Sequence, residues 1–266
     1  MRLAVGIEYD GSAYSGWQSQ ATSRSVQSVL ERALTAVATQ PLHLVCAGRT
    51  DAGVHARWQV AHFETSAHRP LRGWVLGANS ALPSDIALTW ARPVPAHFHA
   101  RYSAEARTYR YVILNRATRS ALAARRVSWI YRPLDQQRMA QAAAQLCGRQ
   151  DFSAFRSAEC QSRSPIRHLE QLSVQRQDDW VVIEATANAF LHHMMRNLVG
   201  LLIAVGRGEG SESWAGEILA SRDRSRAPAT APATGLYLWA VRYPAAFALP
   251  DPLPGSRSTS RSVMIS

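Results

Sequence analysis

Apolar and polar positions alternate near the N-terminus, where Leu3, Val5, Ile7 and Tyr9 share one face and predict a strand. A helical spacing of apolar residues begins after Ser25, whose side chain is suited to cap a helix. The pattern then predicts strands over 42–47, 58–65 and 85–91, and a short helix over 71–81. The first part of the chain therefore has the expected order β-α-β-β-α-β.

The same order returns further along the chain. Its expected elements are a strand over 105–115, a helix over 134–147, paired strands over 168–176 and 180–187, an apolar helix over 189–206 and a strand over 235–243. A short helix near Trp214 is extra. Because β-α-β-β-α-β is the ferredoxin-like order, we expect an α+β fold with two such halves. These halves are expected to join into one large, mostly antiparallel sheet with helices on one face.

Domain boundaries follow from this repeat. The first half is expected over 1–100 and the second over 101–250. Residues 251–266 contain Pro, Ser and Arg without periodicity, which predicts a disordered tail.

The charge balance restricts the kind of partner. The chain has 30 basic residues against 19 acidic ones, a formal net charge of +11, and every basic residue is an arginine. Guanidinium groups match phosphates in a bidentate manner and stack on bases, so the excess favours a phosphate-bearing partner. The absence of lysine excludes Schiff-base chemistry and a P-loop lysine.

The cysteines and the apolar runs indicate the compartment. Three widely spaced cysteines fit neither a disulfide framework nor a structural zinc site, and they favour a reducing cytoplasm. Acidic residues interrupt the N-terminal apolar run too early for a signal peptide. The longest apolar run, over 198–206, is too short to cross a bilayer. We therefore expect a soluble, cytoplasmic protein.

The segment CAGRTDAGVHA, over 46–56, has the clearest chemical content. It places Asp51 on a glycine-bounded loop between two expected strands, with Arg49 close enough in sequence to keep the carboxylate ionised. No second carboxylate is near, which argues against a paired acid and base. An oriented carboxylate of this kind suggests a nucleophile. The alternative is an Asx-turn with a structural salt bridge.

Two further segments could accompany this loop. The segment ARTYRY places Arg107, Tyr109 and Tyr111 on one strand face, where they could clamp and stack on a nucleic acid. Tyrosines of strands are also common in protein cores, and this alternative stays open. Arg196 lies in the apolar helix without an acid in the same helix, so it requires a partner elsewhere, and Asp51 is the candidate.

Histidines raise the alternative of a metal site. His192 and His193 are adjacent, and His97 and His99 form an H-x-H pair, but no third ligand has suitable spacing. A metal-dependent hydrolase is therefore one competing hypothesis, and a non-catalytic RNA-binding protein is another.

Three blocks together resemble the tRNA pseudouridine synthase A family: GRTDAGVHA, RTYRY and NAFLHHMMRNLVG, in that order. The resemblance extends to GIEYDGSAYSGWQSQ, FHARYSA, DFSAFRS and CQSRSP, and spans about residues 3 to 250. The string GRTDAGVH is highly specific. One departure is Trp58, which stands where relatives usually have glycine. A bulky residue at this position affects the backbone geometry at the end of the loop of Asp51.

The resemblance implies a fold, an activity and a set of site residues. It implies two ferredoxin-like halves in a homodimer that isomerises uridines 38, 39 and 40 of the tRNA anticodon stem-loop, without cofactor or metal. It implies that Asp51 is the nucleophile, that Tyr109 stacks on the target base and that Arg196 pairs with Asp51. The implied tRNA contacts are Tyr109, Arg49, Phe98, His99, Arg101, Tyr102, Glu159, Cys160, Gln161, Ser162 and Arg163.

Overall fold

The structure is a computed structural model that describes residues 1–252 of the chain. Within the described residues it contains two compact units, one formed by Met1–Glu105 with residues 237–252, the other by Ala106–Leu236. The last strand thus belongs with the first unit, which differs from the expected division into 1–100 and 101–250. The predicted tail over 251–266 lies, from residue 253, outside the described residues.

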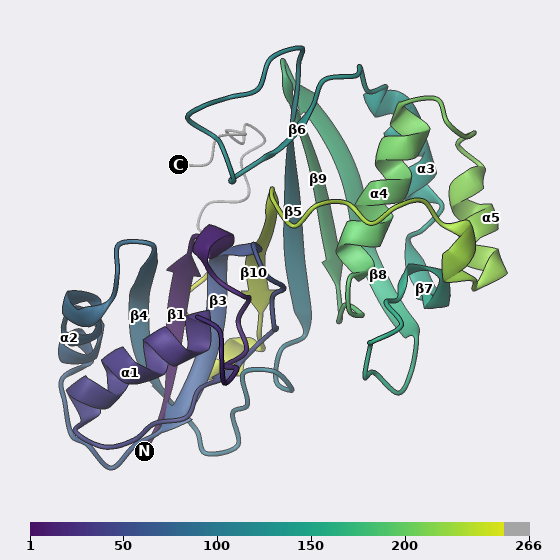
Figure 1. The fold of residues 1–266 in the computed structure, drawn as a ribbon. Coiled ribbons are helices and arrows are strands. Elements are labelled where there is room, and N and C mark those ends of the chain that lie inside the picture. The colour runs from purple at the N-terminus through teal and green to yellow at the C-terminus, as the bar shows by residue number, and fades with distance from the viewer. Residues whose placement is uncertain (253–266) are drawn as a thin grey trace. The chain divides into compact units, whose positions relative to one another are not determined.

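The first unit is built on antiparallel strands and two helices (Figure 1). Its elements are β1 (Arg2–Tyr9), α1 (Val26–Ala38), β2 (Val45–Cys46), β3 (His55–Glu64), α2 (Leu71–Ala81), β4 (Ile86–Val94) and β10 (Leu236–Arg242). The strand order is β4-β1-β3-β10, and β2 also pairs with β3. All these pairs are antiparallel except β10 with β3, which is parallel.

Local sequence explains how α1 begins and which face it buries. The Ser25 side chain accepts a hydrogen bond from the Ser28 N–H, which satisfies one of the unpaired donors of the first turn. The predicted apolar face is confirmed, since Val26, Leu30 and Leu34 are fully buried. Together these contacts place the N-terminus of α1 beside the segment that follows β1.

The second unit has eight further elements. They are β5 (Ala106–Asn115), β6 (Ser128–Ile130), α3 (Gln136–Ala144), β7 (Gly148–Asp151), β8 (Ile166–Gln177), β9 (Trp180–Ala187), α4 (Met194–Gly206) and α5 (Trp214–Ser221). The order β5-β9-β8-β7 is antiparallel throughout, and β6 pairs with β5 in parallel. Across the described residues the protein is an α+β fold with five α-helices and mixed, mostly antiparallel sheet.

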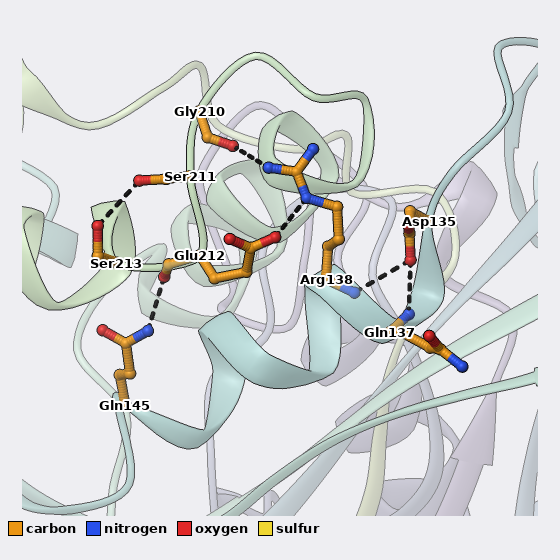
Figure 2. Close-up of polar contacts among 8 residues, drawn as sticks. All are labelled: Asp135, Gln137, Arg138, Gln145, Gly210, Ser211, Glu212 and Ser213. Atoms are coloured by element: carbon orange, nitrogen blue, oxygen red, sulfur yellow. Dashed lines mark hydrogen bonds and ion pairs between the residues drawn. The ribbon is translucent and has the colours of Figure 1, made fainter.

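Polar contacts connect α3 to the loop before α5 (Figure 2). Asp135 caps α3 by accepting from the Gln137 and Arg138 N–H groups. The Arg138 guanidinium pairs with Glu212 and donates to the Gly210 carbonyl at 3.0 Å, and it lowers the pKa of the Glu212 carboxyl through this hydrogen bond. The loop between α4 and α5 is thereby fixed on the helix layer of this unit.

Several element boundaries differ from the sequence-based expectations. The helix expected over 189–206 begins only at Met194, because His193 has left-handed backbone geometry with φ of 62° and ends the preceding loop. The helix expected over 134–147 is shorter at both ends, and β2 keeps only two residues of the strand expected over 42–47. Strands β6 and β7 were not predicted, since three or four residues are too few to show periodicity.

Within residues 1–252, none of the helices combines the length and the apolar character that crossing a membrane would require.

Candidate active site

The loop between β2 and β3 carries Asp51 and is held by backbone hydrogen bonds on one side. The Trp17 N–H donates to the Thr50 carbonyl at 3.0 Å, and the Gly53 N–H donates to the Tyr14 carbonyl at 3.3 Å. Within the loop, the Val54 N–H donates to the Asp51 carbonyl at 3.1 Å. The backbone around Asp51 is therefore tied to residues 14–17 by bonds that do not involve its carboxylate.

Residues 16 and 17 are in turn fixed by the start of α1. The first helical N–H groups, which have no partner within a helix, donate to the carbonyls of Gly16 and Trp17 at 3.1 and 3.0 Å. Gly16 has φ of +90°, and a Cβ built on it would lie 2.6 Å from the Thr50 carbonyl oxygen. Only glycine fits this close approach, so Gly16 sets the position of the loop.

Side chains hold the loop from three further directions. The buried hydroxyl groups of Tyr9 and Thr50 are 2.7 Å apart. The fully buried Gln59 amide donates to the Gly48 carbonyl at 2.6 Å. His55, also buried, stacks on Tyr237 at 4.6 Å, and its Nδ1 accepts from the backbone N–H that opens the 3-10 helix Gly11–Ala13. Asp51 itself is half-buried at the centre of these contacts.

Trp58 lies where the chain leaves this loop. Pairing between β1 and β3 passes from Ile7 with Gln59 to Tyr9 with Ala56, so Trp58 falls in a β-bulge. Its ring is 6.2 Å from that of Trp90, centroid to centroid. The bulky side chain is thus accommodated by the bulge and by an aromatic neighbour, and the pairing on either side continues.

The arginines predicted to bind tRNA in the first unit lie near one another. Burial raises the pKa of the Cys46 thiol to about 12, and the nearby guanidinium groups of Arg49 and Arg101 oppose this shift. Both arginines are exposed. The loop of Asp51 and the segment 98–102 therefore each place an exposed arginine close to Cys46.

The segment 98–102 has a buried anchor and an exposed end. Phe98 has no exposed surface and packs against Tyr243 and Phe247. Tyr102 is 77% exposed, with the Arg101 guanidinium 5.6 Å from its ring centre. Phe98 therefore holds the segment in place, while Arg101 and Tyr102 point to solvent.

His99 and its neighbour His62 are engaged within the protein. His99 Nδ1 accepts from the N–H groups of Arg101 and Tyr102 at 3.1 and 3.2 Å. His62 Nδ1 accepts from the Ala100 N–H at 3.1 Å, and burial lowers the pKa of His62 to about 4. These bonds give both imidazoles a structural task in this segment.

In the second unit Tyr109 lies on β5 with 9% of its surface exposed. Its ring packs edge-on against the ring of Phe190, with the two ring centres 4.8 Å apart. On the other face of β5, Arg110 pairs with Glu184 at 2.8 Å and Thr108 hydrogen-bonds to Thr186. The predicted alternation of these residues between two strand faces is therefore confirmed.

Arg196 lies in the first turn of α4 and is half-buried. Its Nε donates to the Ala231 carbonyl at 2.8 Å, and the Ala231 N–H donates back to the Arg196 carbonyl at 3.1 Å. A Cβ on Gly200 would lie 2.1 Å from the Ala229 carbonyl, so the segment around Ala231 packs directly on the helix. This close packing fixes the guanidinium group of Arg196 at its Nε end.

The segment 159–163 is attached to the loop before α4. The His192 N–H donates to the Cys160 sulfur at 3.4 Å, and Arg156 donates to the Cys160 carbonyl at 2.6 Å. Cys160 is buried, whereas Glu159, Gln161 and Arg163 are exposed. Ser162 accepts a hydrogen bond from Arg167 at 2.6 Å. The buried cysteine thus anchors a segment whose charged ends face solvent.

Sequence reasoning did not identify the residues that position these groups. These residues hold the loop through packing and hydrogen bonds, and their residue types do not indicate that role. They are Gly16, Thr50, His55 and Gln59. Two blocks of the family resemblance contain three of them: GIEYDGSAYSGWQSQ contains Gly16, and GRTDAGVHA contains Thr50 and His55.

Comparisons with known proteins point to one family. A family model described as tRNA pseudouridine synthase matches residues 6–103 and 142–244. The tRNA pseudouridine synthase A of Methylococcus capsulatus is 55% identical over 249 residues, covering 94% of this chain and 92% of that relative. The protein of the same description from Cronobacter sakazakii is 53% identical, covering 96% of this chain and 94% of that relative. The one from Nitrosococcus oceani is also 53% identical, covering 94% of this chain and 96% of that relative.

Proposed function

The chain belongs to the tRNA pseudouridine synthase A family and is therefore a tRNA pseudouridine synthase, an isomerase; from this we propose that its targets are uridines 38, 39 and 40 of the anticodon stem-loop. The observation that most strongly supports a catalytic role for Asp51 is its loop, held on several sides by backbone and buried side-chain hydrogen bonds. We expect the enzyme to act in the cytoplasm. The competing hypotheses of a metal-dependent hydrolase and a non-catalytic RNA-binding protein lose their support.

The proposed reaction requires a carboxylate and space for a moving base. The N1–C1′ bond of uridine breaks, the base turns, and a C5–C1′ bond forms, while a proton leaves C5 and N1 gains one. We propose that Asp51 begins this sequence, either by attack on C1′ or by assisting loss of a sugar proton. Substrate and product have the same atoms and oxidation state, so the proposed reaction consumes no oxidant, reductant or co-substrate.

We propose that two residues of the second unit complete the catalytic group. Arg196 is proposed to pair with Asp51 and keep it ionised, because a guanidinium beside a carboxylate favours the charged form. Tyr109 is proposed to stack on the uracil once the nucleotide has left the RNA helix. We interpret each unit as one ferredoxin-like half, and the joining of the halves into one sheet stays a prediction.

The proposed tRNA contacts are the basic and polar segments around this group. In the first unit they are Arg49, Arg101 and Tyr102, with Phe98 and His99 shaping the segment that presents them. In the second unit they are Glu159, Gln161, Ser162 and Arg163, presented by the buried Cys160. Arginine contacts to phosphates would position the RNA without reading its sequence.

The direct test is incubation of the purified protein with an unmodified tRNA that carries uridines in the anticodon arm, followed by mapping of pseudouridine. We expect modification at positions 38–40 and nowhere else, and the same yield in the presence of EDTA. Pseudouridine at other positions only would overturn the proposed target, and loss of activity with EDTA would revive a metal-dependent mechanism.

Substitution of Tyr109 separates stacking from proton transfer. Tyr109→Phe keeps the ring, so affinity for tRNA should stay near wild type, whereas Tyr109→Ala should weaken binding and turnover together. If the hydroxyl also moves a proton, Phe will lose turnover despite normal binding. Tyr111→Phe is the matched control: its hydroxyl is 2.5 Å from that of Ser128, so its loss should affect stability only. Full activity of Tyr109→Ala would show that the ring is purely a core residue.

We also propose that the protein is a homodimer, by analogy with the family. Light scattering at the concentration of the activity assay should give twice the mass of one chain. The mass of a single chain at that concentration would remove the proposal.

A further inference from the structure

A second basic surface lies in the second unit, away from Tyr109. The segment 116–132 follows β5 and includes β6; it contains five arginines and no acidic residue. Figure 1 shows β6 beside the C-terminal end of β5. Tyr109 is six residues before the end of β5, which corresponds to roughly 20 Å along the strand. Strand β6 therefore lies well away from Tyr109, the residue proposed to stack on the target base.

Two solvent-exposed aromatic side chains lie in the same segment as these arginines. On β6 the burial pattern alternates, with Ser128 and Ile130 buried and Trp129 44% exposed between them. Tyr131 continues the exposed face at 59%, with ring centres of the two aromatics 6.2 Å apart. The Arg132 guanidinium lies 5.8 Å from the Tyr131 ring centre and donates to its hydroxyl at 3.1 Å. Two exposed aromatic faces thus stand beside a fixed cation.

The neighbouring loop is fastened to this strand. Trp129 Nε1 donates to the Arg116 carbonyl at 2.9 Å, and Arg116 donates through Nε to the Thr118 carbonyl at 2.8 Å. The Arg116 guanidinium also donates to the carbonyl of the exposed Arg119 at 3.5 Å, so the two arginines are close neighbours. Arg116 has one acidic neighbour, Asp179 at 3.7 Å, but both are well exposed, so this pair is weak and could open for another anion. We call Arg116, Arg119, Trp129, Tyr131 and Arg132 the arginine–aromatic surface.

We propose that the arginine–aromatic surface binds tRNA outside the anticodon arm. Exposed arginines whose acidic neighbours are few and solvent-exposed suit a phosphate backbone, and exposed aromatic rings suit unstacked bases. A second copy of the chain fits less well, because a twofold contact would set these arginines against the same arginines. The inference rests on the proposed function, since it adds a second contact for the same substrate. The surface would increase the affinity for whole tRNA and leave the chemical step unchanged.

The test compares two substrates and three variants of the full-length protein. The substrates are whole unmodified tRNA and a short stem-loop with only the anticodon arm, and both affinity and turnover at saturation are measured. The variants are Arg119→Gln/Arg132→Gln, Tyr131→Ala, and the control Arg32→Gln/Arg72→Gln, which removes two exposed arginines from α1 and α2.

For whole tRNA we expect the arginine double variant to bind about 10-fold more weakly, with the slope of log K against log salt smaller by about 1.4–1.8. Tyr131→Ala should weaken binding by about 5-fold or more. Affinity for the stem-loop and turnover of bound RNA should match wild type, and the control should change little.

Three results would overturn the proposal: equal losses with both RNAs, an equal loss in the control, or a change of oligomeric state by light scattering. The last would assign the surface to a contact between copies. If the wild type binds tRNA without making pseudouridine, the proposed function fails, while the affinity difference between the two RNAs still decides this inference.

Discussion

Asp51→Asn is expected to lower turnover on tRNA on the order of 10⁴-fold or more, while leaving the fold and the affinity for tRNA near wild type. Asparagine nearly matches aspartate in shape. The loop is also anchored by backbone bonds from Trp17 to the Thr50 carbonyl and from Gly53 to the Tyr14 carbonyl, which the change leaves in place. The amide cannot act as an anionic nucleophile. Single-turnover rates and equilibrium binding to unmodified tRNA measure the two quantities separately.

Asp178→Asn provides the matched control for this change. Asp178 is exposed in the turn between β8 and β9 and has φ of 52°, a conformation that asparagine adopts readily. This variant should turn over like wild type. Loss of turnover with retained binding separates a nucleophile from a structural Asx-turn. If Asp51→Asn folds, binds and makes pseudouridine at the wild-type rate, the catalytic interpretation of the loop is wrong.

The effect of Asp51→Asn on stability should be modest. Removal of one partner from a fully buried ion pair costs about 3–5 kcal/mol, but Arg196 is half-buried and its Nε has a backbone acceptor in Ala231. We therefore expect a loss smaller than this range. Denaturant unfolding of the wild type and the variant measures it, and a loss at the upper end would show that Arg196 depends on Asp51 for its burial.

Gly16→Ala is expected to lower turnover by about 10²-fold, with a smaller change in the affinity for tRNA. Its Cβ would lie 2.6 Å from the Thr50 carbonyl oxygen and 3.1 Å from the Asp51 carbonyl carbon, so the loop must shift. A misplacement of about 1 Å can cost this much in rate. The left-handed φ of +90° adds strain on the order of 1–3 kcal/mol. Rates at saturating tRNA, together with the affinity, separate misplacement from lost binding.

Gly148→Ala isolates the backbone strain from the displacement of the loop. Gly148 has a similar φ of +101°, but the nearest atom to its Cβ would be 4.0 Å away. Both variants should lose stability, and only Gly16→Ala should lose turnover. Equal turnover in the two variants would mean that Gly16 does not position Asp51.

The sequence by itself determined the features that depend on neighbouring residues. Ser25 as the cap of α1, the buried face of that helix and the alternation of residues along β5 are all confirmed. Each depends on contacts within one turn or on the two-residue period of a strand, which single-sequence patterns record directly. The string around Asp51 also identified the family, because it resembles that family's sequence over several consecutive residues.

Only the tertiary structure decided how the loop is held and where some elements begin and end. Tyr9 meets Thr50 across 41 residues, and Gly11 meets His55 across 44, and no periodicity records a contact between segments so far apart. The close approach of Gly16 to the Thr50 carbonyl oxygen is of the same kind, since a glycine does not reveal which backbone will lie against it. The residues that position Asp51 therefore became visible only after folding, because packing between distant segments selects them.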